Sequence, residues 1–236
     1  MSNRIPLVLV PGLLLDGALW RAQIEGLADL AEPEVADLTR QDSLAAMARD
    51  VLAAMPARFA LAGLSLGGYV ALEILRQAPE RVERLALLDT SARPDTPDQT
   101  RRRRGLVALA RRGRFKGVTP RLLPLLIHER RLEDTALTDE ILAMAERVGR
   151  DAFLRQQQAI MGRPDSRPGL HAIGCPTLVL CGRQDALTPL DCSTELAAGI
   201  RDSRLVVVED CGHLAPMERP EAVTRAMRRW LEAPAG

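Results

Sequence analysis

Gly63-Leu64-Ser65-Leu66-Gly67 is the stretch that decides the fold. The residues before it, Arg58 to Ala62, are typical of a short buried strand, and Gly68 to Ala78 carry apolar side chains at helical spacing. A serine at such a strand-to-helix junction is a nucleophile elbow: the glycines leave room for a tight turn, and the helix N-terminus favours negative charge beside the hydroxyl. The stretch therefore predicts that Ser65 is a nucleophile.

Length and composition indicate one globular domain with room for an inserted subdomain. The chain has 236 residues, 47% of them hydrophobic, and a net charge of +1. This balance indicates neither nucleic acid nor a membrane surface as a partner, and no apolar run reaches the roughly 20 residues of a membrane span. The four cysteines fit no metal-binding spacing, so we expect no metal site and reduced thiols in a cytoplasmic protein.

The N-terminal residues have two interpretations. Arg4 followed by the apolar run Ile5 to Leu15 has the composition of a signal peptide. Pro11-Gly12 interrupts that run, and no clear cleavage site follows. We therefore expect a buried strand over Pro6 to Val10 that leads into a loop.

Short apolar strands alternate with helical patterns along most of the chain, which predicts an α/β fold with a mostly parallel sheet flanked by helices. The expected strands cover 5–10, 34–38, 58–63, 84–88, 177–181 and 205–208, and the expected helices cover 17–30, 44–55, 68–78, 191–198 and 220–231.

The segment 91–168 breaks the alternation, because it is helical in character and contains no convincing strand. We expect it to form a helical cap over a core made of 1–90 and 169–236. It carries 17 basic and 10 acidic residues, including the run Arg101 to Arg104. This charge predicts a solvated basic face; the alternative is that the cap attracts an acidic substrate or partner.

A serine nucleophile needs a base, and the chain has three histidines. His213 lies just past the last expected strand, in a loop from which an imidazole could reach the carboxyl edge of the sheet. The nearby Pro and Gly favour a loop there over a helix. His128 in the expected cap and His171 are interpreted as structural.

The acid that orients the base has two candidates, each just after an expected strand. Asp185 gives the order Ser, Asp, His and is preferred; Asp89 is interpreted as a turn residue or a supporting carboxylate. The oxyanion donors are expected to be the backbone N–H groups of Leu66 and of Leu13, with Leu14 as the alternative to Leu13.

Four segments together resemble the α/β-hydrolase superfamily, in particular small capped carboxylesterases such as those of biotin synthesis and the meta-cleavage-product hydrolases. They are 10–13 with Trp20, the elbow 63–68, Gly182 to Asp185, and Gly212 to Pro220. The resemblance implies an α/β-hydrolase fold with a Ser65–His213–Asp185 triad that forms an acyl-enzyme and needs no cofactor. It also implies a small-molecule ester substrate and a monomer or homodimer.

The chain departs from the family pattern at several points. Pro11 replaces the usual histidine of the oxyanion loop, Leu64 replaces the usual histidine before the nucleophile, and the chain begins at the family's third strand. We expect an apolar substrate pocket that includes Leu14, Leu64, Leu126 and Leu214.

Three functions are compatible with this sequence. The first is hydrolysis of carboxylic esters or thioesters of small to medium acyl groups. The alternatives are carbon–carbon bond hydrolysis of a meta-cleavage-type diketone and a non-hydrolytic, ligand-binding role.

Overall fold

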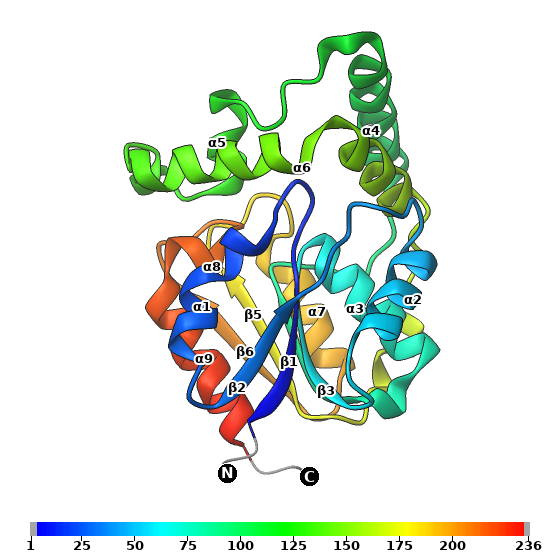
Figure 1. The fold of residues 1–236 in the computed structure, drawn as a ribbon, viewed down its shortest axis with the longest axis vertical. Helices are drawn as coiled ribbons and strands as arrows, with labels where there is room; N and C mark the ends of the chain where they lie inside the picture. Colours follow the sequence, from blue (N-terminus) through cyan, green and yellow to red (C-terminus); the bar gives the residue numbers. More distant parts are fainter. Residues whose placement is uncertain (1–3, 234–236) are drawn as a thin grey trace.

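The described residues of the computed structural model, 4–233, form a single parallel sheet with helices on both faces (Figure 1). Residues 1–3 and 234–236, at the ends of the two expected core ranges, lie outside the described part. The six strands follow the order β2-β1-β3-β4-β5-β6, and all five neighbouring pairs are parallel. This confirms the predicted α/β-hydrolase architecture. The strands are β1 (Ile5–Val10), β2 (Ala31–Val35), β3 (Phe59–Leu64), β4 (Val82–Leu88), β5 (Thr177–Gly182) and β6 (Ser203–Val208).

Nine α-helices occur in the described range, together with short 3-10 turns such as Gly17–Trp20. They are α1 (Arg21–Gly26), α2 (Leu44–Ala54), α3 (Leu66–Gln77), α4 (Pro97–Leu109), α5 (Leu123–Leu126), α6 (Thr135–Met161), α7 (Leu190–Gly199), α8 (Ala215–Glu218) and α9 (Pro220–Glu232).

The alternation of side chains along each strand divides the core into two layers. In β1, Leu7 and Leu9 belong to the buried cluster that includes residues of α9, whereas Val8 and Val10 belong to the cluster on the other face, which includes residues of α2 and α3. Both faces of the central strands are therefore buried, which explains why β3 reads as a continuous apolar run rather than an alternating one.

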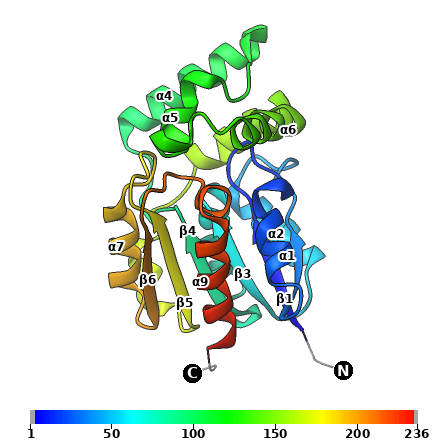
Figure 2. The same ribbon diagram turned by 90° about the vertical axis from the view of Figure 1, so that its left-hand side faces the viewer.

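The helices α4, α5 and α6 lie together above one end of the sheet (Figures 1 and 2). They belong to residues 91–168, here called the cap segment, and the structure places no strand among these residues. Helix α6 is broken at Gly149, which has φ 77° and ψ 176°. Such a conformation favours glycine, and it lets one long helical run change direction over the sheet.

Several boundaries differ from the sequence-based expectation. The helix expected over 17–30 ends at Gly26, and the strand expected over 34–38 is β2, which begins at Ala31 and contains Pro33. β2 pairs only with β1, so it is an edge strand, where a proline is tolerated. The prediction of a loop after His213 is wrong in part, because α8 begins at Ala215.

Within residues 4–233, no helix is long and apolar enough to cross a membrane.

Candidate active site

The carboxyl ends of β1 and β3 mark the point where the direction of the strand order reverses. From β1 the chain crosses to β2 on one side and then to β3 on the other. Ligands of parallel α/β sheets bind in the crevice outside such a switch point. Ser65 directly follows β3, and Pro11-Gly12 directly follows β1, so both lie at this switch point.

Ser65 has a backbone conformation that only a well-supported turn can hold, with φ 55° and ψ −114°. Its N–H donates to Leu88 O at 3.1 Å, and its carbonyl oxygen accepts from Gly68 N, Tyr69 N and Thr90 Oγ1. A strained residue persists when its surroundings fix it in this way, and such strain clusters at functional sites. The side chain is half-buried at the start of α3.

The elbow leaves no space for a side chain at its glycines. A Cβ added at Gly67 would lie 2.1 Å from Val10 O, so the first turn of α3 can pack on the end of β1 only with glycine there. A Cβ added at Gly12 would lie 3.3 Å from Ser65 Cβ. The loop after β1 therefore lies against Ser65, the candidate nucleophile, where an oxyanion donor would be needed.

The two candidates for that donor differ in their hydrogen bonding. Leu14 has φ 59°, and its N–H donates to Gln156 Oε1 at 3.1 Å. For Leu13 N and Leu66 N no acceptor is found within residues 4–233. Because an oxyanion donor must be free for the substrate, this difference favours Leu13 over Leu14 beside Leu66.

His213 and Asp185 are joined directly. The distance from His213 Nδ1 to Asp185 Oδ2 is 2.8 Å, and the two residues are only 3% and 4% exposed. No hydrogen bond between Ser65 Oγ and His213 is found in the described residues, although both follow strands at the same edge. A carboxylate that accepts from Nδ1 keeps the proton there and leaves Nε2 as the basic nitrogen.

The carboxylate of Asp185 is also held from the other side. Leu187 N and Thr188 N donate to its Oδ1 at 2.8 and 3.0 Å, and Thr188 Oγ1 donates to its Oδ2 at 2.7 Å. Burial alone would raise the pKa of Asp185, but the His213 charge and hydrogen bond, together with the Thr188 hydrogen bonds, lower it below the usual value. Asp185 is therefore an ionised partner for an imidazolium.

Asp89 follows β4 and contacts the end of β5 rather than His213. It is fully buried with φ 44°, and its Oδ1 accepts from Gly182 N at 2.8 Å, while its Oδ2 has no partner among the described residues. Burial and the neighbouring charge of Asp185 raise its pKa well above the usual value. From the end of β4, Asp89 thus binds the last residue of β5, three positions before Asp185, and its role as a supporting carboxylate stays a prediction.

The structure also shows the surroundings of the other two histidines and of the four leucines expected in the pocket. His128 is buried and its Nδ1 accepts from Arg130 N at 3.1 Å, whereas His171 is exposed on a short turn. Leu64 and Leu214 are fully buried in one cluster, against which the half-buried Leu126 packs. Leu14 packs instead with the cap residues Ala110 and Phe153. The four leucines are thus divided between two clusters, and their role in a pocket stays a prediction.

The basic run of the cap segment is only partly paired. Arg101 pairs with Asp98, and Arg103 pairs with Asp95, whereas Arg102 and Arg104 are exposed without a carboxylate partner in the described range.

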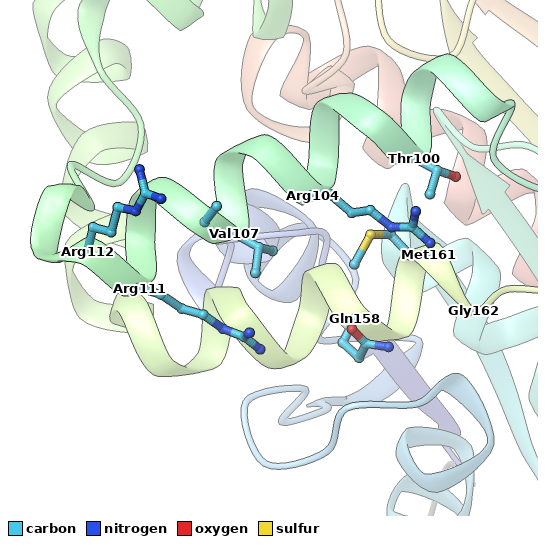
Figure 3. Close-up of a pocket in the computed structure, with 9 residues that line it drawn as sticks. Thr100, Arg104, Val107, Arg111, Arg112, Gln158, Met161 and Gly162 are labelled. Carbon is cyan, nitrogen blue, oxygen red and sulfur yellow. The ribbon is translucent and has the colours of Figure 1, made fainter.

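A cavity of about 590 Å³ lies between α4 and α6, and Arg104 and Arg111 extend along it (Figure 3). No triad candidate lines this cavity. Since both guanidinium groups are exposed, their charges are hydrated.

Three supporting residues were not identified from the sequence. Thr188 follows Asp185 by three residues, a spacing that allows side chain–backbone hydrogen bonds and could have been noticed. Gln156 is 142 positions from Leu14, whose N–H it accepts, and no local pattern indicates it. Glu218 lies in the segment Gly212 to Pro220 and binds Gly212 N six positions away, but its contact with His128 N spans 90 positions and was not predicted. Among the described residues no cluster of side chains could hold a metal ion.

The comparisons with known proteins agree with this architecture. The model of a family described as the alpha/beta hydrolase family matches residues 7–226. The chain therefore belongs to the α/β-hydrolase family, which confirms the resemblance found in the sequence.

Individual relatives span nearly the whole chain. A pimeloyl-[acyl-carrier protein] methyl ester esterase of Nitrosomonas europaea is 28% identical over 238 residues, 93% of each protein. A 2-hydroxy-6-oxononadienedioate/2-hydroxy-6-oxononatrienedioate hydrolase of Paraburkholderia xenovorans is 27% identical over 85% of this chain and 72% of its own. The malate-bound structure of a thermophilic esterase from Thermogutta terrifontis aligns with a TM-score of 0.88 and 34% identity, covering 96% of this chain and 89% of that one.

Proposed function

We propose that the protein is a serine hydrolase that cleaves carboxylic esters of small to medium acyl groups through Ser65, His213 and Asp185. The observation that carries the proposal is the buried Asp185–His213 pair, 2.8 Å apart, at the sheet edge where strained Ser65 follows β3. The similarity to proteins named as esterases supports the ester as the bond attacked.

The chemistry follows from the protonation states. Neutral His213 takes the Ser65 proton at Nε2 while Ser65 Oγ attacks the acyl carbonyl carbon. The N–H groups of Leu13 and Leu66 donate to the oxygen that becomes negative. His213 then gives its proton to the leaving alcohol, and a water activated in the same way releases the acid from Ser65.

Asp185 contributes by keeping the imidazole in one tautomer and by stabilising its cation. Its lowered pKa keeps it ionised throughout, so it need not accept a proton from His213. The cap segment is proposed to cover the acyl group, because α5 and α6 lie above the same edge of the sheet (Figure 2).

The test is hydrolysis of a chain-length series of p-nitrophenyl esters by the wild-type protein and by Ser65→Ala. Turnover that vanishes in the variant supports the proposal, and the preferred length measures the acyl site. A folded wild-type protein that hydrolyses a vinylogous diketone faster than every ester would contradict it in favour of carbon–carbon cleavage. Absence of turnover on both substrate classes would contradict the hydrolase mechanism itself.

A further inference from the structure

Glu218 carries a fully buried carboxylate that the proposed reaction does not use. Its Oε1 accepts from Gly212 N at 2.9 Å and from Leu214 N at 3.2 Å, the two residues that flank His213. Its Oε2 accepts from His128 N at 2.7 Å. One carboxylate therefore binds backbone donors of two segments that are far apart in the sequence.

Those two segments also contact each other directly. The carbonyl oxygen of Leu126 accepts from His213 N at 3.0 Å and from Leu214 N at 3.1 Å. A Cβ added at Gly212 would lie 2.8 Å from His128 N, so the two backbones touch without room for a side chain. The His213 loop and residues 126–128 of the cap segment thus form one hydrogen-bonded unit.

A buried carboxylate such as that of Glu218 lowers the stability of the fold unless hydrogen-bond donors compensate for the water that it has lost. Burial raises the pKa of Glu218 above its usual value, and the N–H groups of His128, Gly212 and Leu214 offset only part of this rise. Only an acceptor with two oxygens can bind all three donors from one side chain, and an apolar replacement would leave buried N–H groups without partners. The buried carboxylate is thus matched to the donors it holds.

We propose that Glu218 is a positioning residue that fixes His213 by binding its loop to residues 126–128, so that the base and the cap segment are placed together. The inference rests on the proposed function, in which His213 is the base. It predicts that loss of one Glu218 oxygen as an acceptor disturbs His213 and the cap segment at the same time.

The decisive variant is Glu218→Gln, because the amide has nearly the same volume but presents an NH₂ group to one set of donors. For p-nitrophenyl acetate, whose acyl group is the shortest of the ester series, we expect kcat to fall about 10–100-fold with KM little changed, as for a displaced catalytic group. Glu73→Gln is the control: Glu73 is a buried carboxylate on α3 that pairs with Arg76 and Gln77, and its loss should leave kcat unchanged. Unchanged kcat in Glu218→Gln would overturn the proposal.

Amide hydrogen exchange provides a readout that does not require turnover. In Glu218→Gln, residues 126–128 and 212–214 should lose protection together, whereas in Glu73→Gln both should keep it. Loss confined to 212–214 would show that Glu218 supports one loop only and would overturn the coupling. If the wild-type protein hydrolyses no ester, the proposed function fails while exchange still decides whether the two segments are coupled.

A shorter carboxylate guards against a variant that does not fold. Glu218→Asp keeps the charge but cannot reach both segments, so its kcat should lie between those of wild type and Glu218→Gln. The downfield proton signal of His213 Nδ1 should weaken in the same order. A variant series in which stability falls while kcat and this signal stay constant would assign Glu218 a purely structural role.

Discussion

Gln156 Oε1 accepts the N–H of Leu14 at 3.1 Å, and through this bond the cap segment sets the shape of the loop after β1. The Gln156 side chain is 1% exposed, and its Nε2 donates to Leu38 O at 3.3 Å. Leu14 is held with φ 59°, a conformation that non-glycine residues rarely adopt. The neighbouring N–H of Leu13 is the proposed oxyanion donor, so its direction depends on this contact.

Gln156→Leu should therefore impair catalysis as well as stability. The Leu14 N–H would be buried without an acceptor, which costs about 1–3 kcal/mol of unfolding free energy. We expect kcat to fall by up to about 100-fold, since loss of an oxyanion donor costs about 10²–10³ and here it is only displaced. Gln158→Leu, the same change at an exposed position of α6, is the control for both measurements. Equal kcat values for the two variants would contradict the link to Leu13.

Replacement of the two candidate acids separates their roles. Asp185→Asn should keep the fold and lower kcat by about 10⁴-fold, because the amide favours the wrong tautomer of His213. Asp89→Asn should retain most of the activity, since Asp89 contacts Gly182 N and not His213. Steady-state kinetics of both variants on one ester, with circular dichroism as a check of folding, decides the assignment. The reverse pattern would make Asp89 the acid.

Asp89 should also give the protein a characteristic pH dependence of stability. Its pKa is raised in the folded protein by burial and by the charge of Asp185, whereas the unfolded chain has the ordinary value of about 3.9. The folded state therefore binds the proton more tightly, and the stability from this group is full below pH about 4 and is lost as pH rises through the raised pKa. Urea unfolding of wild type and Asp89→Asn between pH 4 and 8 should show wild type losing stability relative to the variant. A difference that is constant with pH would show that Asp89 is ionised in the folded state.

The basic face of the cap segment is expected to contribute little to substrate selection. Arg102 and Arg104 are exposed, and we expect the two charges together to contribute at most about 1 kcal/mol, because water and salt screen them. The double variant Arg102→Gln/Arg104→Gln should change kcat/KM for a carboxylate-bearing ester by less than about fivefold and leave neutral esters unaffected. Arg103 is left in place because it pairs with Asp95 and Gln157. A large loss of kcat/KM on the anionic ester alone would contradict this expectation and support the alternative that the cap segment attracts acidic substrates.

The parts of the structure that depend on neighbouring residues in the sequence could be predicted. The elbow at Ser65 needs glycines at fixed offsets, and the strands of the inner sheet are short apolar runs, so the family and the sheet were expected correctly. β2 was misplaced because its exposed glutamates and Pro33 obscure the strand pattern. The break in α6 depends on a positive φ at Gly149, which the composition of the segment does not reveal.

The contacts that join the cap segment to the candidate site could not be predicted, because each links residues far apart in the sequence. Gln156 and Leu14 are 142 positions apart, and Glu218 and His128 are 90 apart. Glutamine and glutamate are ordinary surface residues of helices, so nothing in the local pattern of Gln156 indicates its contact. Glu218 belongs to the segment Gly212 to Pro220 that carries the family resemblance, but its position in the sequence does not show that its carboxylate reaches His128. Only the fold shows that both are buried against the loops that carry the proposed donors and base.

The contacts of Gln156 with Leu14 and of Glu218 with His128 restrict which cap segments of related proteins could replace this one. A chimaera that grafts a foreign cap onto this core would remove the Gln156 side chain that accepts from Leu14 N and the His128 N–H that donates to Glu218 Oε2. Gly212 N and Leu214 N would still bind Glu218 Oε1. A foreign cap must therefore supply a side-chain acceptor for Leu14 N and a donor for Glu218 Oε2, so the cap and the two loops beneath it can be exchanged only as matched parts.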